Sequence, residues 1–130
     1  MVQIDYDREM VFIANAPRED GEGEETLGTV RTWTDADNLR CEFAVMVHDR
    51  MKGEGLGVAL MQKMIDYCRA KGTVEMVGDV LPDNRPMLQL AEHLGFEIHY
   101  NTEEEVMDLT LVLNEPEKDW QRERLEQTSH

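Results

Sequence analysis

The sequence predicts an α/β (α+β) fold in which helices pack on a mixed, mostly antiparallel sheet. Three apolar stretches joined by short polar turns come first, and segments with helical spacing then alternate with further apolar stretches. Strands joined by short turns form antiparallel meanders, whereas helices between strands pack on a face of the sheet. The chain has 130 residues, which fits one domain.

The first three strands are expected at 10–14, 26–33 and 40–47. An acidic, glycine-containing loop at 17–25 separates the first two, and the polar turn 35–38 separates the second from the third. The three strands should therefore form a meander.

Apolar residues recur at steps of three and four from Val58 to Cys68, which predicts a helix ending at Gly72. A strand is expected at 73–80. The next helix should begin at Pro86 and end at Gly95, since proline suits a first helical position and glycine a C-terminal cap. An alternating strand at 106–113 completes a core spanning 1–113, and 114–130 is expected to be a polar surface tail.

The composition excludes several classes of partner. The formal net charge of -15 repels nucleic acids and anionic membranes. No apolar run approaches the roughly 18 residues of a membrane span, and the acidic N-terminus lacks a signal-peptide pattern, so a cytoplasmic protein is expected. Cys41 and Cys68 are too few for a disulfide framework or zinc site and should be small buried residues. The histidines show no metal-ligand spacing, so no metal is expected.

Three glycines, Gly53, Gly55 and Gly57, lie where a strand gives way to a helix. Such a turn leaves several backbone N–H groups unpaired, and together they can hold a phosphate. Arg50 and Lys52 should raise the local potential. The alternative is a turn whose glycines only allow a strand and a helix to pack closely.

Two nucleotide-binding motifs fail on spacing. A P-loop needs Gly-Lys-Ser/Thr after four variable residues, and that sequence does not occur. The dinucleotide pattern Gly-x-Gly-x-x-Gly/Ala places Val58 or Leu60 at its last position. Neither residue satisfies the motif.

The segment Lys52-Gly53-Glu54-Gly55-Leu56-Gly57 resembles the acetyl-CoA motif of the GNAT superfamily, Gln/Arg-x-x-Gly-x-Gly/Ala after a strand, with Lys52 at the Gln/Arg place. Asn84, followed by a helix that ends in Leu94-Gly95-Phe96, is similar to the family's second cofactor motif. The blocks 3–10, 42–45 and 84–87 resemble the acetyltransferase domain of Pat-type protein lysine acetyltransferases. The resemblance covers about residues 3–113.

This resemblance implies a GNAT-like sheet that lacks the usual N-terminal strand and helices. It also implies the residues that hold acetyl-CoA as co-substrate. The backbone of Val45, Met46 and Val47 would bind the pantetheine arm, Lys52, Gly53, Glu54, Gly55, Leu56 and Gly57 the pyrophosphate, and Asn84 the pantetheine from the second helix.

The resemblance also makes Glu42 the expected catalytic base, because a carboxylate can take the proton from an amine whose unperturbed pKa is about 10.4. The alternative is a solvated strand carboxylate. Many GNAT enzymes place a tyrosine in the second helix as acid toward the leaving thiolate, and Ala91 occupies that place here. The leaving-group acid is therefore unassigned.

The expected function is transfer of an acetyl group from acetyl-CoA to an amine, in first place a protein lysine. A small-molecule amine is an alternative acceptor, and a non-catalytic acyl-CoA-binding or interaction module is an alternative function. A second copy of the chain could supply the missing sheet edge, so a homodimer is considered as well.

Overall fold

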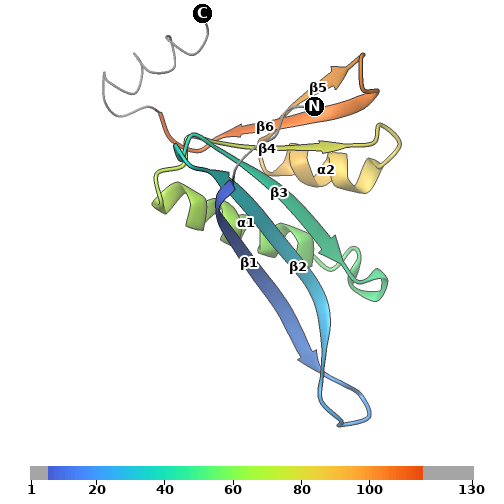
Figure 1. Cartoon of the computed structure of the whole chain (residues 1–130). Helices are drawn as coiled ribbons and strands as arrows, with labels where there is room; N and C mark the ends of the chain where they lie inside the picture. The colour runs from blue at the N-terminus through green and yellow to red at the C-terminus, as the bar shows by residue number, and fades with distance from the viewer. Residues whose placement is uncertain (1–5, 116–130) are drawn as a thin grey trace, which may run out of the picture.

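The computed structural model describes residues 6–115 of the chain. Six strands and two α-helices are present within these residues (Figure 1). In chain order they are β1 (Tyr6–Pro17), β2 (Glu24–Asp35), β3 (Arg40–Val47), the short 3-10 helix η1 (Asp49–Met51), α1 (Leu56–Ala70), β4 (Glu75–Val80), α2 (Arg85–His93), β5 (Glu97–Asn101) and β6 (Val106–Val112).

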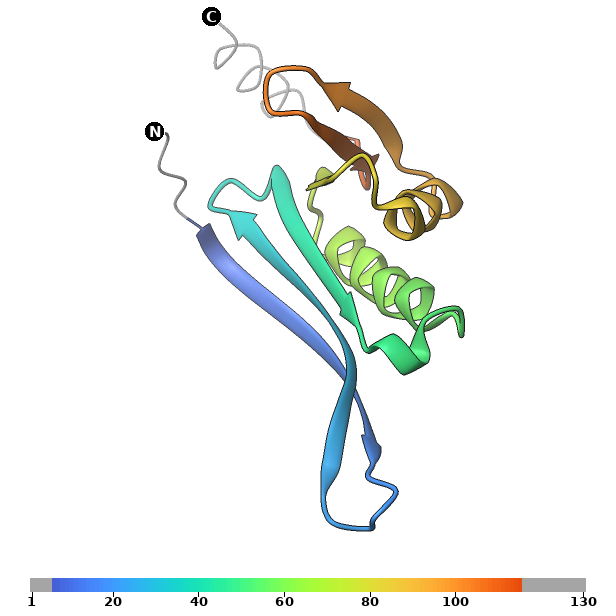
Figure 2. The ribbon, with the colours of Figure 1, turned by 90° about the vertical axis from the view of Figure 1, so that its right-hand side faces the viewer.

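The strands form one sheet in the order β1-β2-β3-β4-β6-β5. Only β3 and β4 run parallel, and every other neighbouring pair is antiparallel. This arrangement confirms the predicted mixed, mostly antiparallel sheet and its initial meander. Both helices lie on the same side of the sheet, which leaves its other face free of described elements (Figure 2).

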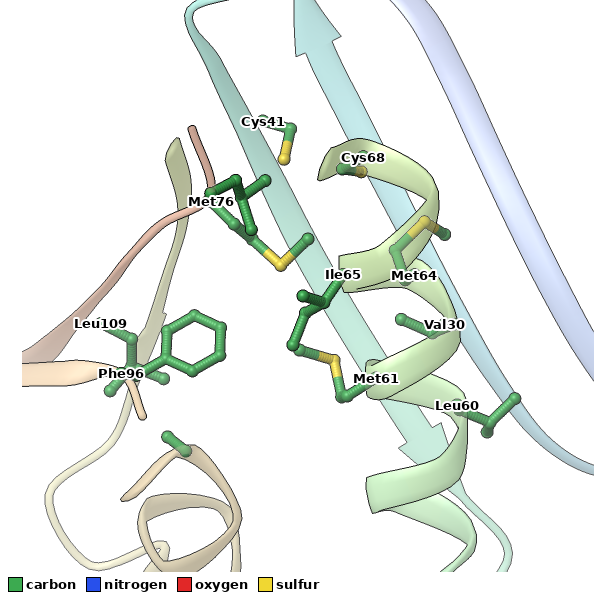
Figure 3. Close-up of a cluster of buried hydrophobic side chains, with 12 residues drawn as sticks. Val30, Cys41, Leu60, Met61, Met64, Ile65, Cys68, Met76, Phe96 and Leu109 are labelled. Carbon is green, nitrogen blue, oxygen red and sulfur yellow. The ribbon is translucent and has the colours of Figure 1, made fainter. Parts of the chain in front are cut away.

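The core lies between this sheet and α1, and the alternation of side chains along the strands explains why. In β2, Val30, Thr32 and Thr34 are buried while Arg31 between them is exposed. Alternate residues of a strand point to opposite faces, so the buried set faces the helices. Figure 3 shows the side chains of α1 meeting those of the strands. The fully buried residues of α1 include Met61, Met64 and Cys68, and Met76 and Leu109 continue the core into β4 and β6.

One strand was missing from the sequence prediction. β5 has five residues, of which only Ile98 and Tyr100 are apolar, and Tyr100 remains exposed. Its strand conformation depends on antiparallel pairing with β6, from Glu97 opposite Thr110 to Asn101 opposite Val106. Pairing of this kind is a tertiary contact that a five-residue pattern does not reveal.

The strands β3 and β4 part near their middle. They pair only through residues 40–42 of β3 and 75–77 of β4. At the next position, the ring of Phe43 lies over Gly78, where an added Cβ would be only 2.6 Å from the ring. The same ring packs against Phe96, with the ring centroids 5.3 Å apart. The aromatic ring thus packs against β4 and Phe96 at the point where pairing between β3 and β4 stops.

Two parts of the sequence prediction lie outside the described residues. They are the beginning of the 3–10 block and almost all of the tail from 114 to 130. Within residues 6–115, no helix is both long enough and apolar enough to cross a bilayer.

The contact between Phe43 and Gly78 gives a test of the packing at this point. Gly78→Ala should lower the free energy of unfolding by about 1–3 kcal/mol, because the added methyl group overlaps the ring. Urea denaturation measures the change. Phe43→Leu in the Gly78→Ala background should recover part of the loss, whereas strictly additive effects of the two substitutions would show that the ring and the methyl group do not interact.

Candidate active site

The parted strands leave one side of β3 without a strand partner. On one side, β2 pairs with Val45, Met46 and Val47. On their other side, β4 does not pair with them, and no other described strand does. The side chain of Met46 is 73% exposed. Backbone N–H and C=O groups on an unpaired strand edge can bind an extended ligand as if it were another strand. The predicted ligand-binding segment of β3 therefore has the required free edge.

The glycine turn follows directly, between η1 and α1. Gly53 and Gly55 have φ angles of 84° and 82°, and no atom lies within 4 Å of a Cβ added at either residue. Both residues have a left-handed backbone conformation, which residues other than Gly, Asn and Asp rarely adopt. This conformation explains why glycine occupies both positions. The alternative that these two glycines serve close packing is wrong. Gly57 differs, because a Cβ there would make ordinary contacts with Leu90 and Val47.

The turn presents the start of α1 without a cap. Gly55 is the N-cap residue, no side chain caps the helix, and the first turn holds no acidic residue. The first N–H groups of a helix have no partner within it and favour an anion. The turn 52–57 therefore offers backbone donors at the end of the free β3 edge.

The basic side chains at the turn contribute less potential than the sequence suggested. Arg50 forms an ion pair with Glu25 of β2, and the Nζ atom of Lys52 lies 3.1 Å from the Asp49 carboxylate. Each positive charge thus has a nearby negative one. The potential that these two side chains add at the turn is therefore partly cancelled.

Gly28 of β2 is a site residue that the sequence prediction missed. A Cβ at Gly28 would lie 2.9 Å from the carbonyl oxygen of Met46 and 3.0 Å from the Leu60 side chain. The glycine lets the beginning of α1 approach the sheet beside the free part of β3. Its only signal in the sequence is a small residue among larger ones in an alternating strand.

Glu42 lies at the vertex where β3 and β4 part. It is half-buried, is the last β3 residue in register with β4, and has Val77 as its β4 partner. A hollow of about 680 Å³ opens beside it. The hollow is lined by residues of four strands, Trp33, Arg40, Glu42, Phe43, Glu75, Val77, Gly78, Asp79, Asp108, Leu109 and Thr110. The predicted base thus borders a space that a small molecule can enter.

Asn84 has a structural task that the motif did not suggest. Its side-chain oxygen accepts a hydrogen bond from the backbone N–H of Met87 at 3.3 Å, which caps α2. The amide retains its two donors and one acceptor site for the predicted contact with a cofactor. Ala91, at the place of the family's tyrosine, is completely buried.

The two cysteines are buried, as predicted. A hydrogen bond with Cys68 and burial raise the pKa of the Cys41 thiol. A neutral thiol inside the core does not act as a nucleophile. Among residues 6–115, no group of three or more potential ligands is placed to hold a metal ion.

Comparison with known families now identifies the fold. Residues 2–96 match the model of the acetyltransferase (GNAT) family. The chain belongs to the GNAT family. The glycine turn and the parted strands are therefore features of a GNAT domain, and six strands of it are described here.

Two curated relatives share part of this GNAT chain. Acetyltransferase PA5475 of Pseudomonas aeruginosa is 36% identical over 96 residues, which are 74% of this chain and 50% of that protein. An L-methionine sulfoximine/L-methionine sulfone acetyltransferase of Pseudomonas aeruginosa is 42% identical over 57 residues, which are 44% of this chain and 33% of that protein. The chain thus spans half or less of the length of these relatives.

Solved structures with the same fold include the GNAT domain of S. lividans PAT. It has a TM-score of 0.62 and 26% sequence identity, and the match covers 69% of this chain and 56% of that one. The yncA protein of Salmonella typhimurium, solved with its cofactor acetyl-CoA, has a TM-score of 0.61 and 24% identity over 72% of this chain and 61% of that one. Because the yncA protein is only 24% identical to this chain, the match shows similarity of the fold alone.

Replacement of Gly55 separates backbone strain from crowding in the GNAT turn. Gly55→Ala should lower the free energy of unfolding by about 1 kcal/mol, because alanine disfavours left-handed φ. Gly55→Asn should cost less although asparagine is larger, since asparagine tolerates this conformation and the site has room. Urea denaturation compares the variants. A greater loss for asparagine than for alanine would contradict the conformational explanation.

Proposed function

We propose that this domain is an acetyl-CoA-dependent N-acetyltransferase for amines. The observation that carries the proposal is the free edge of β3 at residues 43–47, which follows Glu42 and precedes the turn that leads to the uncapped start of α1. The pantetheine arm of acetyl-CoA is extended and has two amide groups that can pair with such an edge, and its pyrophosphate suits the N–H groups of the turn. Membership of the GNAT family and the acetyl-CoA bound to yncA support the same ligand.

The acidic charge of the chain does not prevent this binding. Charges beyond roughly 8–10 Å are largely screened at physiological ionic strength. Several N–H groups at Gly55, Leu56 and Gly57 would act on the pyrophosphate at hydrogen-bond distance, where charge-assisted bonds are strongest. Local donors therefore outweigh the diffuse field of a chain with net charge -15.

The chemistry follows from the place of Glu42 at the vertex. The acceptor amine loses a proton to the Glu42 carboxylate, directly or through a water molecule, and its nitrogen attacks the thioester carbonyl carbon. The C–N bond of the amide forms and the C–S bond breaks. The attacking nitrogen releases its second proton to solvent, and the CoA thiolate takes up a proton from solvent, because the buried Ala91 at the tyrosine place cannot donate one.

The acceptor proposed here is a small-molecule amine. The relative that shares 42% identity is named for its action on L-methionine sulfoximine and L-methionine sulfone, which are small amines. The hollow beside Glu42 also carries the carboxylates of Asp79 and Asp108, which favour a protonated amine on approach. Protein lysine is the second candidate, and the similarity to the GNAT domain of S. lividans PAT and the block 42–45 support it.

Cofactor binding is tested by calorimetric titration of the full chain with acetyl-CoA. One molecule should bind per chain and should raise the melting temperature, because a ligand that binds only the folded state stabilises it. ATP serves as the control, since it offers phosphates without a pantetheine arm, and should bind at least about tenfold more weakly. No heat and no thermal shift with acetyl-CoA would contradict the proposal.

Catalysis is tested with Glu42→Gln. This variant should bind acetyl-CoA within about twofold of the parent but lose a factor of about 10²–10⁴ in kcat, the usual contribution of a general base. The difference should narrow as the pH rises toward about 10, because the amine then loses its proton unaided. Release of CoA thiol measures the rate. Glu97→Gln, on exposed β5, is the matched control and should remain active.

The acceptor is found by mass spectrometry of products made from methionine sulfoximine, a polyamine and lysine-containing peptides. Acetylation of only the peptides would favour protein lysine over a small amine. Equal rates for the parent and Glu42→Gln would show that Glu42 is not the base. Tight acetyl-CoA binding without transfer to any amine would instead favour the non-catalytic acyl-CoA-binding module.

A further inference from the structure

We propose that Phe43 limits the length of the acyl group that this domain accepts, so that acetyl-CoA is preferred over acyl-CoAs with longer chains. This limit rests on the proposed function, because it concerns the acyl end of the same ligand. Phe43 is the first residue of β3 beyond its pairing with β4, and its ring lies over Gly78 of β4. The ring therefore stands at the closed end of the free β3 edge.

The free edge of β3 ends at a fixed point. An extended ligand that begins at the turn 52–57 can pair with residues 43–47, but the pairing of Glu42 with Val77 closes the space between the strands beyond them. Figure 1 shows β3 and β4 diverging from this region toward their carboxyl ends. The thioester would thus lie beside Phe43, and further carbon atoms of an acyl chain would have to leave the line of the edge.

On the helix side of the sheet, aromatic rings close the way. Cys41 is buried in the core, so Phe43, two residues along β3, points to the same face. A Cβ added at Gly78 would lie 2.6 Å from the ring of Phe43, and the ring centroid of Phe96 is 5.3 Å from that of Phe43. Phe96 is only 6% exposed, so the Phe43 ring cannot retreat without displacing it. A longer acyl chain would therefore overpack this side.

On the opposite face, a longer chain would enter the hollow beside Glu42. Asp79 and Asp108 line that hollow, and the acceptor amine would approach through it. An alkyl chain gains binding free energy in proportion to the apolar area that leaves water, and it stays wet among carboxylates. It would also occupy the space that the amine needs. Neither face thus offers a favourable place for more than an acetyl group.

A smaller side chain at position 43 should open an apolar pocket at the closed end. The space released by the ring borders Gly78 and Phe96, and Leu109, the β6 partner of Gly78, is 1% exposed. Each CH₂ group buried in such a pocket strengthens binding about fourfold, so the two additional groups of a butyryl chain should gain roughly tenfold. Removal of the ring should therefore change the order of preference among acyl-CoAs.

Calorimetric titration of the full chain with acetyl-, propionyl- and butyryl-CoA tests this limit. The parent should bind butyryl-CoA no more tightly than acetyl-CoA. Phe43→Leu should bind butyryl-CoA at least about fivefold more tightly than acetyl-CoA. Phe12→Leu is the matched control, because Phe12 of β1 is also half-buried but packs against Tyr67, with the ring centroids 5.8 Å apart. This control should keep the order of the parent.

The series with the parent needs no variant and can overturn the proposal by itself. Affinity that rises about fourfold with each CH₂ group in the parent would show that Phe43 does not restrict the chain. Phe43→Leu that keeps the order of the parent, or Phe12→Leu that gains as much, would overturn the proposal as well. These results leave the proposed function intact, whereas a parent that binds none of the three acyl-CoAs would contradict that function and the acyl limit together.

Discussion

The parting of β3 and β4 is the constraint on which the rest of this structure depends. Parallel pairing stops after Glu42 and Val77, where the ring of Phe43 lies over Gly78 and reaches Phe96. If β3 and β4 paired along their whole length, the backbone N–H and C=O groups on that side of β3 would all bond to β4, and none would be free for a ligand. The ring packs between the parting strands, and the hollow opens beside it at Glu42. One aromatic contact thus joins the packing of the core to the geometry of the site.

The position of α1 places an anion-binding group of backbone N–H donors at one end of this edge. Gly28 allows the first turns of the helix to lie close to the sheet, and Gly53 and Gly55 turn the chain from β3 into the helix with left-handed backbone. The uncapped N–H groups then lie at the end of the free edge that is remote from Glu42. A ligand with an anionic end and an extended arm would be oriented with its other end toward the carboxylate. The order of the sites along β3 therefore matches the order of groups in acetyl-CoA.

The sequence allowed much of this arrangement to be predicted, because the decisive signals are local. Apolar periodicity located α1 and the long strands, and the spacing 52–57 located the turn. The short strand β5 depends on β6, and the contact of Phe43 with Gly78 depends on packing between distant segments, so neither leaves a local pattern. The ion pair of Arg50 was likewise unforeseen, since its partner Glu25 comes from another strand. The roles of Glu42 and Asn84 toward a ligand rest on resemblance and position together.

Hydrogen exchange with and without acetyl-CoA reports directly which backbone groups the ligand protects. Acetyl-CoA should slow exchange in the free part of β3, residues 43–47, and in the first turn of α1, while β1 and β5 stay unchanged. Protection of this pattern would place the cofactor along the parted strands. Binding that leaves 43–47 unprotected, or that protects only other segments, would show that acetyl-CoA does not bind along the free edge of β3.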